Sequence, residues 1–239
     1  MNVRRAAALA VGGYLIGSIS FARLIGRRVA ANEDLSQNTL NLPGGAMVDY
    51  GGVSATSIAI RGGPAWGVIT GVLDMAKAFV PTFVVRRRWP DEPYHLVVAV
   101  ASDVGHNYPV YHRFRGGRGQ TPIYGSLLAV DWPARPITPT AGSAIGLLVF
   151  RDMYVAYWLG NCLLIPWFEW RAGPPEVAYA AAANLLLAIA GIPETRSYFE
   201  KRRAGELQQV SSWRELLASH PAMRGNLDEA ASKPDHASG

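Results

Sequence analysis

The stretch AAALAVGGYLIGSISFARLI, residues 6–25, decides the fold class of this chain. Its only charged side chain, Arg23, stands near the end, where a long side chain can extend to the membrane surface. A helix of about twenty apolar residues spans the hydrocarbon core of a bilayer. Arg4 and Arg5 precede the stretch, as they would in a signal peptide, but its length and the apolar blocks that follow favour a membrane span.

Four further long apolar blocks follow, together with two shorter ones. The long blocks are Gly67–Val85, Leu96–Tyr111, Met153–Trp167 and Val177–Ile192, and the short ones are Ile123–Val130 and Ala141–Phe150. The short blocks fall below spanning length, so flanking residues must extend them unless they are re-entrant. The sequence therefore predicts an all-α fold: a polytopic integral membrane helical bundle of about seven transmembrane helices, five of which rest on the long blocks.

The composition agrees with a membrane protein. Hydrophobic residues make up 49% of the chain and charged residues 17%, below the roughly 25% of typical soluble domains. The net charge is +5, but the basic residues lie in short loops between apolar blocks. There, anionic lipid headgroups are nearer partners than a nucleic acid, so no nucleic-acid partner is expected. The lone Cys162 excludes an intrachain disulfide and a cysteine metal site.

The third long block ends in a basic, glycine-rich segment, GHNYPVYHRFRGGRG, from Gly105 to Gly119. Its glycines let backbone N–H groups approach an anion closely, and the guanidinium groups of Arg115 and Arg118 can grip phosphate. His106, at its start, either orients a hydroxyl or phosphate or is a hydrogen-bonded structural residue. A phosphate site at a membrane surface suggests an enzyme of lipid headgroups. The alternative is a positive-inside loop whose glycines only turn the chain.

A second group with possible chemistry lies inside an apolar block. Asp74 and Lys77 stand three residues apart, on one face of a helix. Ionisable residues at membrane depth are costly and usually paired, and they often mark function. The pair therefore either supports a functional site or fixes helix packing as a structural ion pair.

The loop before this block carries glycines and hydroxyls, YGGVSATS, from Tyr50 to Ser57. Gly51 and Gly52, with the hydroxyls that follow them, could form an anion-binding nest or a helix N-terminus aimed at phosphate. Equally, the serines and the threonine could simply cap a helix.

The order of these motifs resembles the bacterial acyl-phosphate:glycerol-3-phosphate acyltransferases, small polytopic membrane enzymes that make lysophosphatidate. The resemblance covers roughly residues 14–150. Residues 14–21, YLIGSISF, resemble the family's YLIGSIPF, and Asp74-x-x-Lys77 resembles its LDxxKG, with Ala78 in place of glycine. The segment from Gly105 to Gly119 is similar to GHxxPVFxxFKGGKG, with arginines where lysines are usual.

Other family motifs are altered in this chain. The family's GSGNIGATNxxR appears at residues 49–57 without its functional serine and asparagines, and its arginine falls at Ile60, next to Arg61. The motif RYxSLxS has lost its serines near residues 153–157. The motif HRxNIxR survives only at residues 195–201, without its histidine and asparagine, and residues 29–50 look like an insertion.

The resemblance implies that glycerol 3-phosphate attacks an acyl phosphate and releases inorganic phosphate, with no cofactor and no metal. It implies catalytic roles for Arg115, Arg118 and His106, and structural support from Asp74 and Lys77. The expected substrate-binding residues are Gly51, Gly52, Ser54, Thr56, Ser57, Arg61, Asn107, Gly116, Gly117 and Gly119.

Residues 1–192 are expected to form one membrane-embedded domain, and residues 193–239 a polar, partly disordered C-terminal tail. The expected partners are acyl phosphate, glycerol 3-phosphate and membrane phospholipids, and the sequence indicates no oligomeric state. The loop arginines favour an inner-membrane protein with cytoplasmic motif loops and tail, although the Arg86–Arg88 cluster opposes this orientation. The altered motifs leave an alternative: a catalytically impaired paralogue that binds a phospholipid or a partner protein.

Overall fold

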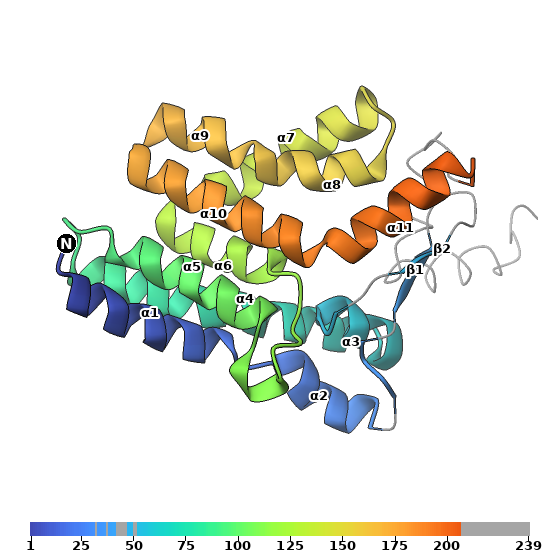
Figure 1. Ribbon diagram of the computed structural model, residues 1–239, viewed down its shortest axis with the longest axis horizontal. Coiled ribbons are helices and arrows are strands. Elements are labelled where there is room, and N and C mark those ends of the chain that lie inside the picture. Colours follow the sequence, from blue (N-terminus) through green and yellow to red (C-terminus); the bar gives the residue numbers. More distant parts are fainter. Residues whose placement is uncertain (32, 37, 42–46, 50–51, 207–239) are drawn as a thin grey trace, which may run out of the picture.

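The computed structural model describes residues 1–31, 33–36, 38–41, 47–49 and 52–206. These residues form a helical bundle with one small β-hairpin (Figure 1). The elements are α1 Val3–Gly17, α2 Phe21–Val29, β1 Thr39–Asn41, β2 Met47–Asp49, α3 Ala55–Gly62, α4 Pro64–Arg88, α5 Tyr94–Asn107, a 3-10 turn η1 Val110–His112, α6 Gln120–Val130, α7 Ala134–Leu148, α8 Met153–Cys162, α9 Leu164–Arg171, α10 Pro174–Ala190 and α11 Ile192–Arg203. The antiparallel hairpin pairs Leu40 with Val48 and is the one departure, among the described residues, from the all-α prediction.

Two helical segments are long and apolar enough to cross a membrane. They are Val3–Val29, which joins α1 to α2, and α4, and each has a mean hydropathy of 1.6. Helices α10 and α11 count as a third if they form one broken span, bent by 63°. Helices α5 to α9 have between 8 and 15 residues, fewer than the roughly 20 of a straight span. Helix length in the described residues thus supports two or three spans and leaves the seven-span prediction unconfirmed.

Helix α4 has the distribution of side chains expected in a lipid environment. Its polar residues Asp74 and Lys77 are buried in the bundle. Several of its valines point outward, with Val68, Val72 and Val84 exposed to 66%, 58% and 57%. A helix with a polar inner face and an apolar outer face suits a membrane span whose interior carries function.

Small residues let α1 and α5 pack at close range. A Cβ atom added to Gly17 would lie 2.2 Å from the carbonyl oxygen of Ser102, and one added to Gly105 would lie 2.2 Å from that of Tyr14. The Gly13-x-x-x-Gly17 pattern therefore serves helix packing, as in many membrane helix pairs. This contact also fixes the end of α5, from which the basic segment continues.

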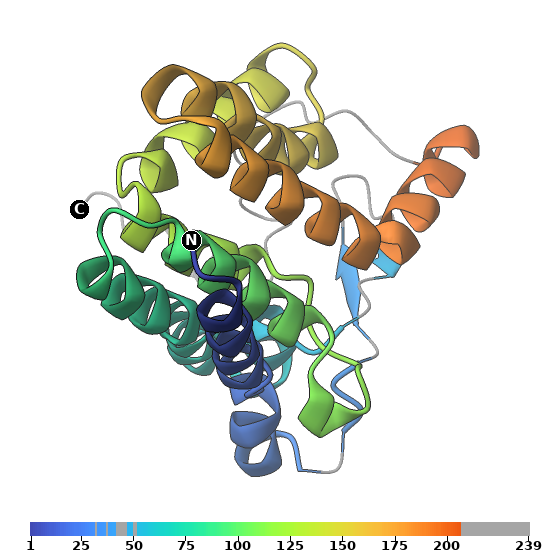
Figure 2. The ribbon, with the colours of Figure 1, turned by 60° about the vertical axis from the view of Figure 1, so that its left-hand side comes forward.

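Helix α11 leaves the end of α10 at an angle and runs beside the hairpin (Figure 2). It is tied to the start of α8, because the Tyr198 hydroxyl donates to the Asp152 carboxylate and Arg202 lies 3.2 Å from the same oxygen. The rings of Tyr154 and Tyr198 stack with centroids 4.2 Å apart. Helical structure thus continues past residue 192 into the segment expected to be a polar tail, whose residues 207–239 lie outside the described part.

Candidate active site

A cavity of about 730 Å³ lies where the basic segment meets the loop before α3 and the start of α11. One wall comes from Arg23 of α2 and from Gly52 and Val53. The basic segment forms a second wall, and the junction of α10 and α11 forms the third. The two glycine-containing motifs that the sequence singled out separately therefore share one cavity.

A backbone hydrogen bond joins the two glycine-containing loops. The N–H of Val53 donates to the carbonyl oxygen of Gly116 at 3.2 Å. Gly52 adopts a φ of 105°, which favours glycine, and a Cβ atom there would lie 3.3 Å from the same oxygen. The two loops thus lie on one face, as the sequence predicted, although Gly51 itself lies outside the described residues.

The basic segment folds back tightly over the end of α5. The N–H of Gly117 donates to the carbonyl oxygen of His106 at 3.1 Å. A Cβ atom would lie 2.0 Å from that oxygen if added to Gly116, and 2.2 Å from the His106 Nε2 if added to Gly117. Both glycines are therefore required by close packing. The turn also places Arg113 and Phe114 in the left-handed region, with φ of 53° and 59°.

Four arginines line the cavity: Arg23, Arg113, Arg115 and Arg118. Within the described part of the chain, neither Arg113 nor Arg115 forms an ion pair, and both are exposed. Arg118 is only 6% exposed and pairs with the carboxylate of Glu194. Helix α6 begins directly after this segment, and α3 begins directly after Val53, so two helix N-termini add positive potential. The cavity therefore suits an anionic ligand.

The cavity wall also holds Asp34 and His112. Hydrogen bonds from the side chain and the backbone N–H of Ser36 lower the pKa of the Asp34 carboxyl, so it is ionised at neutral pH. Burial, with the positive charges of Arg23 and Arg27 nearby, lowers the pKa of His112. The His112 imidazole is therefore neutral at pH 7 and adds no charge to the site.

A buried ion pair lies beneath the basic segment. Lys77 Nζ is 2.8 Å from Asp74 Oδ1, and it also donates to the carbonyl oxygen of Ile19 at 2.7 Å. His106 Nδ1 lies 3.8 Å from the same Asp74 oxygen. Because Gly117 packs on the other nitrogen of this imidazole, His106 connects the ion pair to the wall of the cavity.

The family model described as glycerol-3-phosphate acyltransferase matches residues 7–199. The chain belongs to this family. The glycerol-3-phosphate acyltransferase of Anaeromyxobacter sp. (strain K) is 35% identical over 186 residues, which are 76% of this chain and 87% of that protein. The enzyme of that name from Methylococcus capsulatus is 28% identical over 164 residues, 64% of this chain and 77% of the relative.

A solved structure shares the fold. It is the crystal structure of PlsY (YgiH), an integral membrane glycerol 3-phosphate acyltransferase, in its glycerol 3-phosphate form. The TM-score is 0.68 at 23% identity, and the match covers 89% of this chain and 98% of the PlsY chain. This member of the glycerol-3-phosphate acyltransferase family therefore shares the helical fold of that integral membrane enzyme.

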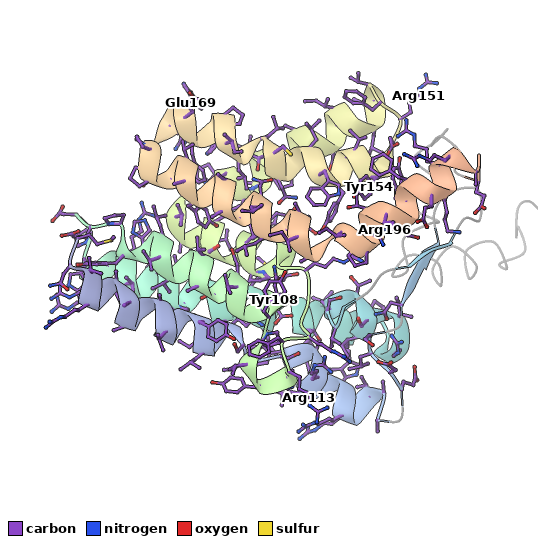
Figure 3. The ribbon with its side chains drawn as sticks, in the orientation of Figure 1. Tyr108, Arg113, Arg151, Tyr154, Glu169 and Arg196 are labelled. Atoms are coloured by element: carbon purple, nitrogen blue, oxygen red, sulfur yellow. The ribbon has the colours of Figure 1, made fainter. Side chains whose placement is uncertain are left out.

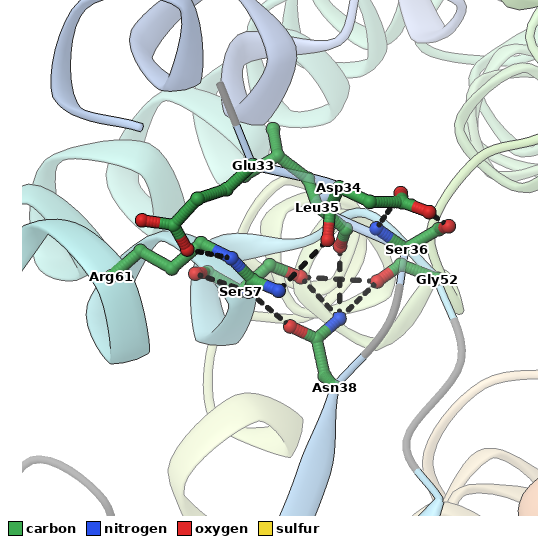
Figure 4. A network of polar contacts seen from close by, with 8 residues as sticks. All are labelled: Glu33, Asp34, Leu35, Ser36, Asn38, Gly52, Ser57 and Arg61. Carbon is green, nitrogen blue, oxygen red and sulfur yellow. Dashed lines mark hydrogen bonds and ion pairs between the residues drawn. The ribbon is translucent and has the colours of Figure 1, made fainter. Parts of the chain in front are cut away.

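A network of polar contacts behind the cavity fixes the position of the Gly52 loop (Figure 4). Asn38 Nδ2 donates to the carbonyl oxygen of Gly52 at 3.1 Å and to the Ser57 hydroxyl at 3.0 Å. Arg61 donates to the Asn38 side-chain oxygen and pairs with Glu33 at 2.9 Å. Asn38 and Glu33 come from the segment that looks like an insertion, so this segment supports the loop.

Six of the residues expected from the glycerol-3-phosphate acyltransferase resemblance line the cavity: Gly52, Asn107, Arg115, Gly116, Gly117 and Arg118. Gly119, with a φ of 90°, precedes α6 and packs on Asn107. Ser54, Thr56, Ser57, Arg61 and His106 are not among the lining residues. Ser57 accepts a 3.1 Å hydrogen bond from the Ser54 N–H, which is a helix-capping contact.

The sequence pattern did not indicate several residues of the site, among them Arg23, Asp34, Asn38, Arg113 and Glu194. Arg23 was noted only as a charge near a span end, where it was expected to extend to the membrane surface. Glu194 directly precedes residues 195–201, where the family's terminal motif is altered. The one available signal for Glu194 was a charged residue directly after the last apolar block.

Proposed function

We propose that this protein transfers an acyl group from an acyl phosphate to glycerol 3-phosphate and so makes lysophosphatidate for phospholipid synthesis. The observation that carries this proposal is a cavity lined by four arginines and a glycine-rich turn, in a member of the glycerol-3-phosphate acyltransferase family. The two PlsY structures with this fold are a glycerol 3-phosphate form and a lysophosphatidic acid form. These ligands are the acceptor and the product of the proposed reaction.

The reaction requires little covalent participation by the protein. A glycerol hydroxyl oxygen forms the new ester bond with the acyl carbon, the bond from that carbon to the phosphate oxygen breaks, and inorganic phosphate leaves with the pair of electrons. The hydroxyl proton ends on the released phosphate, which leaves as hydrogen phosphate, so atoms and charge balance. Because phosphate is a good leaving group, holding two anions together and neutralising their charge supplies most of the catalysis.

The exposed guanidinium groups of Arg113 and Arg115 bind phosphate oxygens in this mechanism, and Arg118, paired with Glu194, forms the wall of the cavity beside them. Gly116 and Gly117 let the turn pack closely on His106, which fixes the position of these arginines. His106 and the ion pair of Asp74 with Lys77 keep the turn in place from below. The cavity thereby positions both substrates on one cationic surface.

This function fits a topology in which the cavity opens to the cytoplasm, where soluble glycerol 3-phosphate is available. On this proposal residues 1–192 lie in the inner membrane, the shorter helices complete about seven spans, and residues 193–239 are cytoplasmic.

This orientation is tested with single cysteines, introduced at residue 113 or at residue 90 of a cysteine-free protein. Labelling of intact spheroplasts by a membrane-impermeant maleimide is expected at residue 90 and not at residue 113, and the opposite pattern would reject this orientation.

The reaction is tested with the full chain, purified in lipid nanodiscs, palmitoyl phosphate and radiolabelled glycerol 3-phosphate. We expect lysophosphatidate and inorganic phosphate in equal amounts, and no product when palmitoyl-CoA replaces palmitoyl phosphate. Product from the thioester alone would reject the acyl-phosphate donor. Binding of glycerol 3-phosphate without product would instead support the impaired paralogue.

A further inference from the structure

Glu194 brings a carboxylate into an otherwise cationic part of the cavity. It lies in the first turn of α11, directly after the bend at Gly191. Its side chain is 12% exposed, and its Oε2 atom pairs with the Arg118 guanidinium, which is 6% exposed. The pair therefore lies in the cavity wall, where the charge of Arg118 is largely compensated.

The charge of the cavity is consequently uneven. Arg113 lies on the turn beside α2 (Figure 3), and Arg115 and Arg23 lie close by, since Arg23 donates to the Arg115 carbonyl oxygen at 2.9 Å. In the described residues, no carboxylate forms an ion pair with any of these three arginines. The pair of Arg118 with Glu194 lies instead against the junction of α10 and α11.

This asymmetry acts differently on the two ends of a glycerol phosphate. A phosphate group is repelled by the Glu194 carboxylate and attracted to Arg113 and Arg115, which form no ion pair in the described residues. A hydroxyl group, in contrast, donates to a carboxylate, and hydrogen bonds to charged acceptors are strong. A carboxylate offers about four acceptor positions, so binding Arg118 leaves room for a hydroxyl.

We propose that Glu194 binds the hydroxyl end of glycerol 3-phosphate and so orients it, with its phosphate toward Arg113 and Arg115. This inference rests on the proposed function and makes Glu194 a determinant of substrate specificity. It predicts that the cavity prefers glycerol 3-phosphate over propyl phosphate, which has the same phosphate and carbon chain but no hydroxyls. The preference depends on the carboxylate of residue 194.

The test compares the dissociation constants of both ligands by calorimetry, using the full chain in nanodiscs. For the unaltered protein we expect glycerol 3-phosphate to bind at least about tenfold more tightly than propyl phosphate. In Glu194→Gln, glycerol 3-phosphate should bind about tenfold more weakly. Propyl phosphate should bind equally well or more tightly, because residue 194 no longer repels its phosphate or compensates the charge of Arg118. The preference should therefore disappear.

Equal weakening of both ligands would overturn the proposal, because Glu194 would then only hold Arg118 in place. Loss of the preference in Asp34→Asn and not in Glu194→Gln would also overturn it, since the hydroxyls would then lie at Asp34. Glu169→Gln is the matched control, because Glu169 is exposed on α9, far from the cavity (Figure 3). It should leave both constants unchanged.

A second variant covers the case in which Glu194→Gln does not fold. Glu194→Asp keeps the charge beside Arg118 but withdraws the carboxylate by one methylene group, so the preference should still fall severalfold. A full preference in this folded variant would count against the proposal. Failure of the unaltered protein to bind glycerol 3-phosphate would reject the proposed function itself, which the variants do not address.

Discussion

The backbone N–H of Val53 donates a hydrogen bond of 3.2 Å to the carbonyl oxygen of Gly116. This bond joins two loops that are distant in the sequence, and each loop is held from behind by its own polar side chain. Asn38 holds the loop of Val53, and His106 underlies the turn of Gly116. The two walls of the cavity therefore depend on separate supports, which can be altered one at a time.

Arg115→Ala should weaken the binding of glycerol 3-phosphate by about 10- to 150-fold, because it removes charge-assisted hydrogen bonds to phosphate. The melting temperature should not change, since the Arg115 side chain is exposed and forms no ion pair in the described residues. Calorimetry and thermal melting in detergent measure the two effects. Arg28→Ala removes the same charge from an exposed residue that does not line the cavity, and it should bind normally. Equal losses in both variants would reduce the role of Arg115 to long-range electrostatics.

Asp74→Ala should destabilise the protein by about 3–5 kcal/mol, because it leaves the buried Lys77 ammonium without its carboxylate. Adding Lys77→Met should restore much of the stability, as an apolar side chain replaces the stranded charge. If the pair supports the cavity through His106, the double variant should remain poor in acyl transfer although it is stable. A double variant with full stability and full activity would assign the pair to helix packing alone.

Asn38→Ala should lower the stability by about 1–3 kcal/mol, because Arg61 and the Gly52 carbonyl group lose a buried partner. The KM for glycerol 3-phosphate should rise as well, since the Gly52 wall is no longer held. Asn2→Ala provides the comparison, because Asn2 caps α1 at the start of the chain and accepts from the Arg5 N–H at 3.1 Å. It should cost about 1 kcal/mol and leave KM unchanged. An equal rise in KM in both variants would contradict this role of Asn38.

Acidification should destabilise the protein in part through His112. Its pKa is lowered in the folded state by burial and by the charges of Arg23 and Arg27, so the unfolded chain takes up this proton more readily. The contribution of His112 is therefore fully present above about pH 6.5 and is lost as the pH falls toward the lower pKa of the folded state. His112→Asn should flatten this part of a plot of Tm against pH. Parallel curves for the two proteins between pH 7 and pH 5 would contradict the assignment.

The sequence predicted features whose physical cause is local. Arg115, Arg118 and the glycines around them stand together in one short segment, so their chemistry could be inferred without a fold. The spans at Val3–Val29 and α4 followed from their length and hydropathy. The hydroxyls of Ser54 and Ser57 left two interpretations open, because a capping side chain and an anion-binding side chain have the same sequence pattern.

Residues that reach the cavity through tertiary contacts could not be found in this way. Asn38 lies in a segment without a recognisable motif, and it matters only because the chain returns past Gly52 and Ser57. Glu194 enters the site because the chain bends by 63° between α10 and α11. No periodicity or residue spacing in the sequence predicts such a bend or its direction. Helix α5 packs mainly against α1, α6 against α4 and α7 against α8, which a count of apolar blocks does not reveal.

Helix α11 contacts two different parts of the bundle. Near its start, Glu194 pairs with Arg118, and near its end Tyr198 and Arg202 contact Asp152 at the start of α8. Because a helix is stiff over this length, a displacement of α8 is transmitted along it to the Arg118 guanidinium. If α8 lies in the membrane, as the proposed topology places it, the lateral pressure of the lipid on α8 has a mechanical route to the candidate cavity.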